Sequence, residues 1–229
     1  MSADATDPDS TRQACQGSAV VYNCVHPRPG EDYERFVTMS KNIIDGAETA
    51  GAKLILAASV YPYGKVDRPV TEDMPDRPVE PTGELHAKGV QMAMEAHEQG
   101  RVRVAVGRSS NYFGPNAGRS YAGEGIFYNA LFSKSASVIG NVDMPHTYTY
   151  VDDFAGGLIT LGERDEALGE IWHVPSAETI TTRQFIDMVY NEAGEETKIL
   201  AGTRIPLTFR SIFSKHMRFA LQVLYQFDR

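Results

Sequence analysis

The sequence predicts an α/β protein with an incomplete doubly wound parallel sheet and a smaller C-terminal α+β lobe. Three observations carry this prediction. The runs Ala19–Cys24 (AVVYNC) and Lys53–Ser59 (KLILAAS) are too continuously apolar to have a solvated face, which is typical of strands buried on both sides. A helical pattern separates them. After Arg108 this rhythm gives way to turns rich in Gly and Asn, where we expect the smaller lobe to begin.

Helical and strand patterns alternate through the first half of the chain. Tyr33–Ala50 places apolar side chains at helical spacing, and Gly51 supplies the stop signal. Leu85–Gln99 predicts a second helix that ends at Gly100, and Arg101–Gly107 (RVRVAVG) predicts a third strand. Strands separated by helices are joined by crossover connections, so we expect the strands to run parallel.

Shorter elements follow in the second half. We expect a helix near Ile126–Ser133, short strands at Ser137–Ile139 and Thr147–Val151, and helices that begin at Asp152 and Thr182. The acidic pair that opens at Asp152 fits the start of a helix, whose dipole favours negative charge, better than it fits a metal site. No metal site is predicted.

Composition limits the classes of function. The 229 residues are 42% hydrophobic, enough for one sizeable core, and the net charge of -8 argues against a general nucleic-acid binder, which needs basic surface. Two cysteines are too few for a disulfide framework, and no apolar run approaches the roughly 20 residues that span a bilayer. We therefore expect a cytoplasmic protein with a small-molecule substrate, no nucleic acid and no membrane span, and we leave open its association as a homo-oligomer.

A candidate functional residue stands where the second predicted strand ends. Ser59 opens the motif SVYPYG, at the carboxyl edge where open α/β sheets present polar groups to a ligand. Its hydroxyl is placed to hydrogen-bond a substrate oxygen, or alternatively to close the strand with a backbone bond. The segment that follows, Gly64–Pro81, is rich in proline and charge and predicts a surface loop.

Short motifs occur along nearly the whole chain in the order seen in one family. The chain resembles the extended short-chain dehydrogenase/reductase family, and it is similar to NAD-dependent epimerases and dehydratases. Each motif is only a few residues long, so the resemblance depends on their order and spacing. The motifs are Asp4–Asp7 (DATD), Tyr22–Cys24, Asn42, Ser59–Gly64, Glu72, Gly107–Pro115 (GRSSNYFGP) and Thr149–Asp153 (TYVDD).

The resemblance has consequences for both ends of the chain. It implies that the family's first strand, whose Gly-rich turn holds the dinucleotide pyrophosphate at a helix N-terminus, precedes Met1, and that Arg229 lies inside a family segment. No G-x-G-x-x-G or G-x-x-G-x-x-G pattern occurs early in the sequence. We accordingly expect the outer edge of Ala19–Cys24 to be unpaired and the helices that cover that side to be absent.

The resemblance also implies a Rossmann-like domain organisation and a cofactor. Residues 1–115 would be the remaining part of the dinucleotide-binding domain, and residues 116–229 a substrate-binding lobe with interleaved returns to the main domain. The implied cofactor of the full-length form is NAD or NADP, and the implied substrate is a nucleotide sugar or a similar small molecule. The residues placed at the cofactor, which could instead be turn residues, are Asp4, Asn23, Cys24, Val25, Lys88, Arg108, Ser109 and Asn111.

Catalysis in the family uses a Ser or Thr that orients the substrate, a Tyr that moves the proton, and a Lys four residues later. The Lys lowers the Tyr pKa, because a phenol with its ordinary pKa near 10 is a poor base at neutral pH. Ser59 fills the first position. Lys88 fills the third when the helix is aligned on it, but the Tyr position then holds Glu84.

A second alignment does not restore the Tyr–Lys pair. Matching the segment that begins at Pro81 gives Thr82 in the Tyr position and His86 in the Lys position. Tyr61 is followed four residues later by Lys65, but this pair lies in the strand-end turn, so we interpret it as a coincidence. The predicted catalytic residues are Ser59, Lys88, Glu84 and Thr82, with Glu84, His86 and Tyr61 as candidates for a replacement acid or base.

Two functions from different classes fit the sequence. The first is an NAD(P)-dependent epimerase, dehydratase or reductase that acts on a nucleotide sugar or a similar hydroxyl-bearing substrate and that is inactive as this fragment. The second is an atypical family member that binds a dinucleotide or a protein partner as a sensor or scaffold without redox chemistry. The absence of the Tyr–Lys pair keeps the second hypothesis open.

Overall fold

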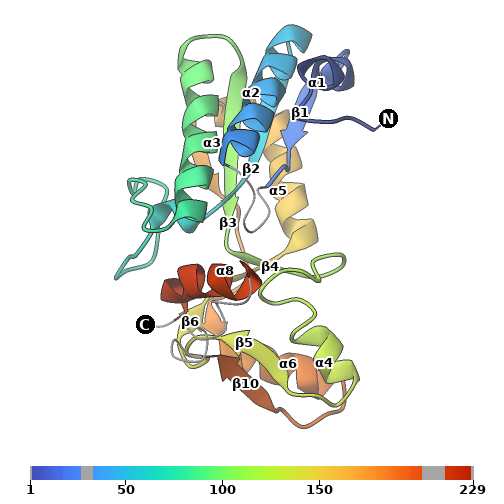
Figure 1. Cartoon of the computed structure of the whole chain (residues 1–229), viewed down its shortest axis with the longest axis vertical. Helices are drawn as coiled ribbons and strands as arrows, with labels where there is room; N and C mark the ends of the chain where they lie inside the picture. The colour runs from blue at the N-terminus through green and yellow to red at the C-terminus, as the bar shows by residue number, and fades with distance from the viewer. Residues whose placement is uncertain (1, 27–32, 203–214, 228–229) are drawn as a thin grey trace. The chain divides into compact units, whose positions relative to one another are not determined.

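The computed structural model of the chain describes residues 2–26, 33–202 and 215–227 (Figure 1). Within these residues no helix combines the length and the apolar character that a membrane crossing needs. The chain divides into two compact units. Unit 1 is Met1–Ser109 with Ala155–Val174, and unit 2 holds the remaining residues. The second unit therefore interrupts the first in sequence.

Unit 1 is built on a parallel sheet with the strand order β1-β2-β3-β8. Its strands are β1 (Val20–Asn23), β2 (Lys53–Ser59), β3 (Arg103–Ser109) and β8 (Ile171–His173). β2 has the bounds that its apolar run predicts, and β1 lies within the predicted run. β3 begins and ends two residues later than expected. The predicted α/β class with a parallel sheet is confirmed.

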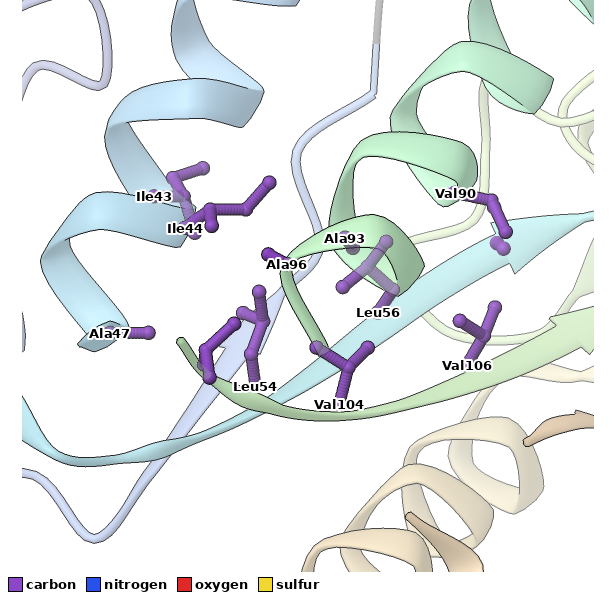
Figure 2. Close-up of a cluster of buried hydrophobic side chains, with 12 residues drawn as sticks. Ile43, Ile44, Ala47, Leu54, Leu56, Val90, Ala93, Ala96, Val104 and Val106 are labelled. Carbon is purple, nitrogen blue, oxygen red and sulfur yellow. The ribbon is translucent and has the colours of Figure 1, made fainter. Parts of the chain in front are cut away.

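Two helices cover one face of this sheet. They are α2 (Tyr33–Ala50) and α3 (Pro81–Glu98), and their apolar sides meet the inward side chains of β2 and β3 (Figure 2). Each fully buried side chain of the size of Leu contributes about 1.5–3 kcal/mol, so this cluster is a principal source of stability. Its members include Ile43, Ile44, Ala47, Leu54, Leu56, Val90, Ala93, Ala96, Val104 and Val106.

Helix α5 (Val151–Glu163) packs on the other face of the sheet from Ala155 onward. At Gly162 its backbone approaches β1 so closely that a Cβ atom would lie 2.3 Å from the Tyr22 hydroxyl oxygen. The sheet is therefore covered on both faces. The expectation that helices are absent on the β1 side was wrong in this respect, because a helix from much later in the chain packs against β1.

Local capping explains two departures from the predicted helices. Helix α1 (Pro8–Cys15), which the sequence pattern did not indicate, begins at a proline, and the Asp7 carboxylate accepts a hydrogen bond from the Asp9 backbone N–H. Helix α3 begins at Pro81 rather than Leu85, because Glu80 caps it. A short 3-10 turn, η1 (Tyr61–Tyr63), follows β2.

Unit 2 consists of short strand pairs and helices, in keeping with the predicted α+β lobe. Strands β4 (Asn111–Phe113) and β7 (Tyr148–Tyr150) pair in parallel, as do β5 (Ala136–Ile139) and β10 (Ile199–Gly202). A third pair, β6 (Pro145–His146) and β9 (Ile180–Thr181), is antiparallel. The helices of unit 2 are α4 (Phe127–Leu131), α6 (Thr182–Glu192) and α8 (Lys215–Val223), and the 3-10 turn η3 (Leu224–Gln226) follows α8. A further 3-10 turn, η2 (Asp165–Ala167), belongs to unit 1.

Candidate functional site

Ser59 lies at the carboxyl end of β2, in register with Ser109 at the end of β3. The Ser59 Oγ atom is buried and has no hydrogen-bond partner among the described residues. A buried hydroxyl without a partner costs about 1–3 kcal/mol, so native proteins rarely keep one without a ligand or water that satisfies it. The structure thus places an unsatisfied hydroxyl at the sheet edge where such folds bind ligands.

A cluster of rings lies next to this strand end. The ring of His86, on α3, lies 5.7 Å from that of Tyr61 and 5.3 Å from that of His26, centroid to centroid. Phe36, on α2, completes the cluster at 6.4 Å from His86. The cluster joins the segment after β1, two helices and η1, so it gathers two of the candidates for a replacement acid or base, His86 and Tyr61.

His86 is held in its neutral form. Burial, and then the nearby His26 and Arg108, lower its pKa to about 3. Its imidazole therefore remains uncharged at neutral pH, and protonating it in the folded protein is costly. A neutral imidazole can donate one hydrogen bond and accept another, which suits the binding of a hydroxyl-bearing substrate better than it suits proton abstraction.

The three predicted catalytic residues of α3, Thr82, Glu84 and Lys88, are not part of the ring cluster around His86. Glu84 is exposed, and Lys88 is half-buried, with its Nζ donating to Gln91 Oε1 at 3.4 Å. Thr82 donates its backbone N–H to Glu80 in the first turn of the helix. The structure therefore brings Tyr61 and His86 together but does not add Glu84 to their cluster.

Glu80 is a buried charged residue that the sequence analysis missed. Its carboxylate accepts from the backbone N–H groups of Thr82 at 2.6 Å and Gly83 at 2.7 Å, and its side chain caps α3. Burial raises its pKa, and these hydrogen bonds oppose the rise. An acid immediately before a Pro at a helix start was the available signal. Glu80 fixes the start of the helix that carries His86.

Arg108, predicted to contact the cofactor, is buried among side chains of unit 1. Its Nη2 lies 2.9 Å from Asp76 Oδ2, and its guanidinium lies 4.5 Å from the centre of the Tyr63 ring. The Tyr63 hydroxyl is hydrogen-bonded to His173 Nε2 at 2.7 Å, and Glu72 accepts from the His173 backbone N–H. These contacts hold the loop after Ser59 against β3 and β8, and a role for Arg108 toward a dinucleotide stays a prediction.

The predicted cofactor residues near the N-terminus form local turns. Asp4 accepts hydrogen bonds from Thr6, which lower the pKa of its carboxyl. Asn23 accepts from the Val25 backbone N–H at 3.0 Å, and Cys24 beside it is exposed. Asn23 and Cys24 lie at the end of β1, Asp4 lies before α1, and the role of all three stays a prediction.

The last two predicted cofactor residues belong to different units. Ser109, in unit 1, is buried at the end of β3. Asn111, in unit 2, is hydrogen-bonded through its side-chain nitrogen to His146 Nε2 at 2.8 Å. Burial lowers the pKa of His146 to about 4, so this pair is uncharged at neutral pH.

The described residues are better suited to contact a sugar or ring substituent than to hold the pyrophosphate of a dinucleotide. The Ser59 hydroxyl fits a sugar or ring substituent. By contrast, the N-terminus of α1 carries Asp7 as its cap and Asp9 in its first turn, and these carboxylates repel a pyrophosphate.

Comparison with solved structures shows the same fold at low sequence identity. A dTDP-glucose 4,6-dehydratase from Streptomyces venezuelae with NAD and DAU bound has a TM-score of 0.77 at 17% identity, over 87% of this chain and 65% of that one. A UDP-glucuronic acid 4-epimerase from Bacillus cereus in complex with NAD has 0.74 at 19%, over 84% and 65%. RMD from Pseudomonas aeruginosa complexed with NADPH has 0.75 at 16%, over 89% and 74%.

No curated protein matches the chain. The chain spans 65% of the length of the first two structures that it resembles, so it corresponds to part of those proteins. The model of the NAD dependent epimerase/dehydratase family, however, matches residues 1–174. This match covers the sheet of unit 1 and the Ser59 strand end, and the chain belongs to the NAD dependent epimerase/dehydratase family.

Proposed function

We propose that the chain forms the substrate-facing part of an NAD(P)-dependent epimerase, dehydratase or reductase that acts on a nucleotide sugar or a similar hydroxyl-bearing substrate. The observation that carries the proposal is the buried Ser59 hydroxyl, which lacks a partner among the described residues. Dehydratase and epimerase neighbours whose names specify dTDP-glucose and UDP-linked sugars support the substrate class.

The residues of the chain have separate roles in this proposal. Ser59 hydrogen-bonds a substrate hydroxyl or carbonyl oxygen, and His86 in its neutral form offers a second polar contact beside Tyr61. Lys88 with Glu84, or His86 with Thr82, would take the Lys and Tyr positions of the family, according to which of the two alignments holds. A nicotinamide, when bound, supplies the hydride chemistry, and Glu80 and Arg108 position the elements that surround the strand end.

Replacing Ser59 by Ala tests the proposal directly. In a form of the protein that turns over a nucleotide sugar, Ser59→Ala is expected to lower turnover by a factor of about 100 or more, since that is the usual scale for a positioned polar catalyst. Tyr61→Phe is expected to matter far less. Ser18→Ala is the matched control, because Ser18 is a half-buried serine that lies before β1, at the edge of the parallel sheet opposite to the carboxyl end of β2.

Steady-state kinetics on the three variants reads out the prediction. If Tyr61→Phe abolishes turnover while Ser59→Ala leaves it intact, the catalytic role belongs to Tyr61 with Lys65. Binding of dTDP-glucose, followed by calorimetry, separates a loss of substrate affinity from a loss of chemistry.

The 229 residues by themselves are expected to bind NAD and NADP poorly. The reason is electrostatic and structural: no Gly-rich phosphate turn occurs early in the sequence, and the capped N-terminus of α1 is acidic. Calorimetric titration with each dinucleotide measures this. Micromolar affinity for either would contradict the prediction and require a different phosphate site.

A second candidate function, binding without turnover, is supported by the geometry of α3. Glu84 is exposed, Lys88 contacts Gln91, and the neutral His86 is a weak proton acceptor. A sensor or scaffold of this kind would bind a nucleotide sugar in the presence of dinucleotide without any change in the absorbance of the nicotinamide. Turnover that depends on Ser59 would exclude it.

A further inference from the structure

Unit 2 contains a concave apolar cavity that the proposed function does not use. Its volume is about 450 Å³, within the range of cavities that hold small molecules. Its walls come from α4, α6, β4, β7, β9 and the segment before β9. All of these elements belong to unit 2, and α4 lies against α6 (Figure 1).

The floor of the cavity is aromatic and offers no free hydroxyl. Phe185 is buried there, with its ring stacked on that of Tyr148 at 4.3 Å and in edge contact with those of Phe113 and Phe127 at 5.2 Å and 5.9 Å. The Tyr148 hydroxyl, the one polar group of these rings, donates to Thr182 Oγ1 at 2.8 Å. A cavity of this composition holds water poorly and favours an apolar group.

The rim combines exposed apolar side chains with negative charge. Leu131 is 74% exposed and Met188 is 60% exposed, although both line the cavity. Among the described residues, the charged ones that line the cavity are Glu178 and Glu192, and none of its described lining residues is Lys, Arg or His. Neither carboxylate forms an ion pair with another described residue. The cavity is therefore complementary to a molecule with an apolar body and a positive end.

We propose that this cavity binds a small organic cation, an amine attached to an aromatic or branched aliphatic group, with its ring on Phe185 and its ammonium between Glu178 and Glu192. The apolar body gains affinity by leaving water, and the two carboxylates select the charge. All residues that line this cavity belong to unit 2, whereas Ser59 belongs to unit 1.

Three probes of the same shape test the charge preference. Phenylbutylamine, phenylbutanol and phenylbutyrate are titrated into the protein by calorimetry at low and high salt. We expect the amine to bind about three- to ten-fold more tightly than the alcohol, because exposed ion pairs contribute modestly, and the acid to bind most weakly. The preference for the amine should shrink as salt screens the carboxylates.

Substitutions on the rim locate the site without disturbing the core. The double change Glu178→Gln with Glu192→Gln should abolish the preference for the amine but keep the alcohol affinity, and Met188→Lys should reverse the order of amine and acid. Glu196→Gln, an exposed acid of unit 2 outside the cavity lining, is the matched control. Absence of binding by all three probes, or equal binding of amine and alcohol in the unmodified protein, would overturn the proposal.

Discussion

Acidification from pH 6.5 to pH 3 is expected to cost unit 1 roughly 4 kcal/mol of folding stability through His86 alone. The unfolded chain protonates this imidazole at its ordinary pKa of 6.5, whereas burial lowers the folded pKa to about 3. Between these values the unfolded state binds more protons than the folded state. Stability is therefore fully present above pH 6.5 and declines as the pH falls through that window, by about 1.4 kcal/mol per unit.

His86→Phe isolates this contribution. Phe keeps an aromatic ring that can pack against His26, Tyr61 and Phe36, but it has no proton to bind. Relative to the variant, the unmodified protein should lose stability steadily below pH 6.5. Denaturant unfolding at several pH values measures the difference, and the single Trp, Trp172 on β8, reports on unit 1 by fluorescence.

Phe36→Leu is the matched control for this experiment. It alters packing in the same ring cluster without removing a titratable group, so its effect on stability should not vary with pH. A difference between the unmodified protein and His86→Phe that is constant with pH would show that His86 is not held neutral by its surroundings.

The sequence was sufficient to predict the bounds of two long elements of unit 1, α2 and β2. The predicted bounds of α2 and β2, Tyr33–Ala50 and Lys53–Ser59, agree with the structure. Their ends are marked by a local signal, since Gly51 has a φ of +65°, which favours glycine, directly after the helix. Where an apolar pattern and a stop signal coincide, tertiary contacts are not needed to define the element.

Elements defined by distant contacts were not predictable in the same way. Strand β8 is three residues long, and Trp172 and His173 give it no apolar run; it exists because it pairs with β3. The start of α3 likewise depends on the Glu80 carboxylate. Short strands and caps carry too few residues to produce a periodic pattern.

The candidate site was predictable in position but not in its contacts. Ser59 could be placed from the end of an apolar strand and from the family motif. The pairing of Tyr63 with His173, 110 residues apart in sequence, could not be anticipated, nor could the burial of Arg108 against Asp76. These contacts depend on how the loop after η1 folds back, and composition predicts only that it is a loop.

The chain of 229 residues is expected to self-associate through β1. This strand is the edge of the sheet, and in the described residues it pairs only with β2. Val20 and Val21 are half-buried and Tyr22 is 39% exposed, and the strand has neither a charged residue nor a proline that would discourage pairing. Unpaired N–H and C=O groups along such an edge are a template for another chain.

Size-exclusion chromatography with light scattering tests this expectation. The unmodified chain should elute as oligomers or larger aggregates at micromolar concentration, and Tyr22→Lys, which puts a charge on the edge strand, should shift it toward the monomer. Gln99→Lys adds the same charge at an exposed position at the end of α3 and should leave the association unchanged. Because α5 already covers one face of β1, association would have to proceed through the backbone edge. A monodisperse monomer that melts cooperatively from the unmodified chain would show that this edge is protected.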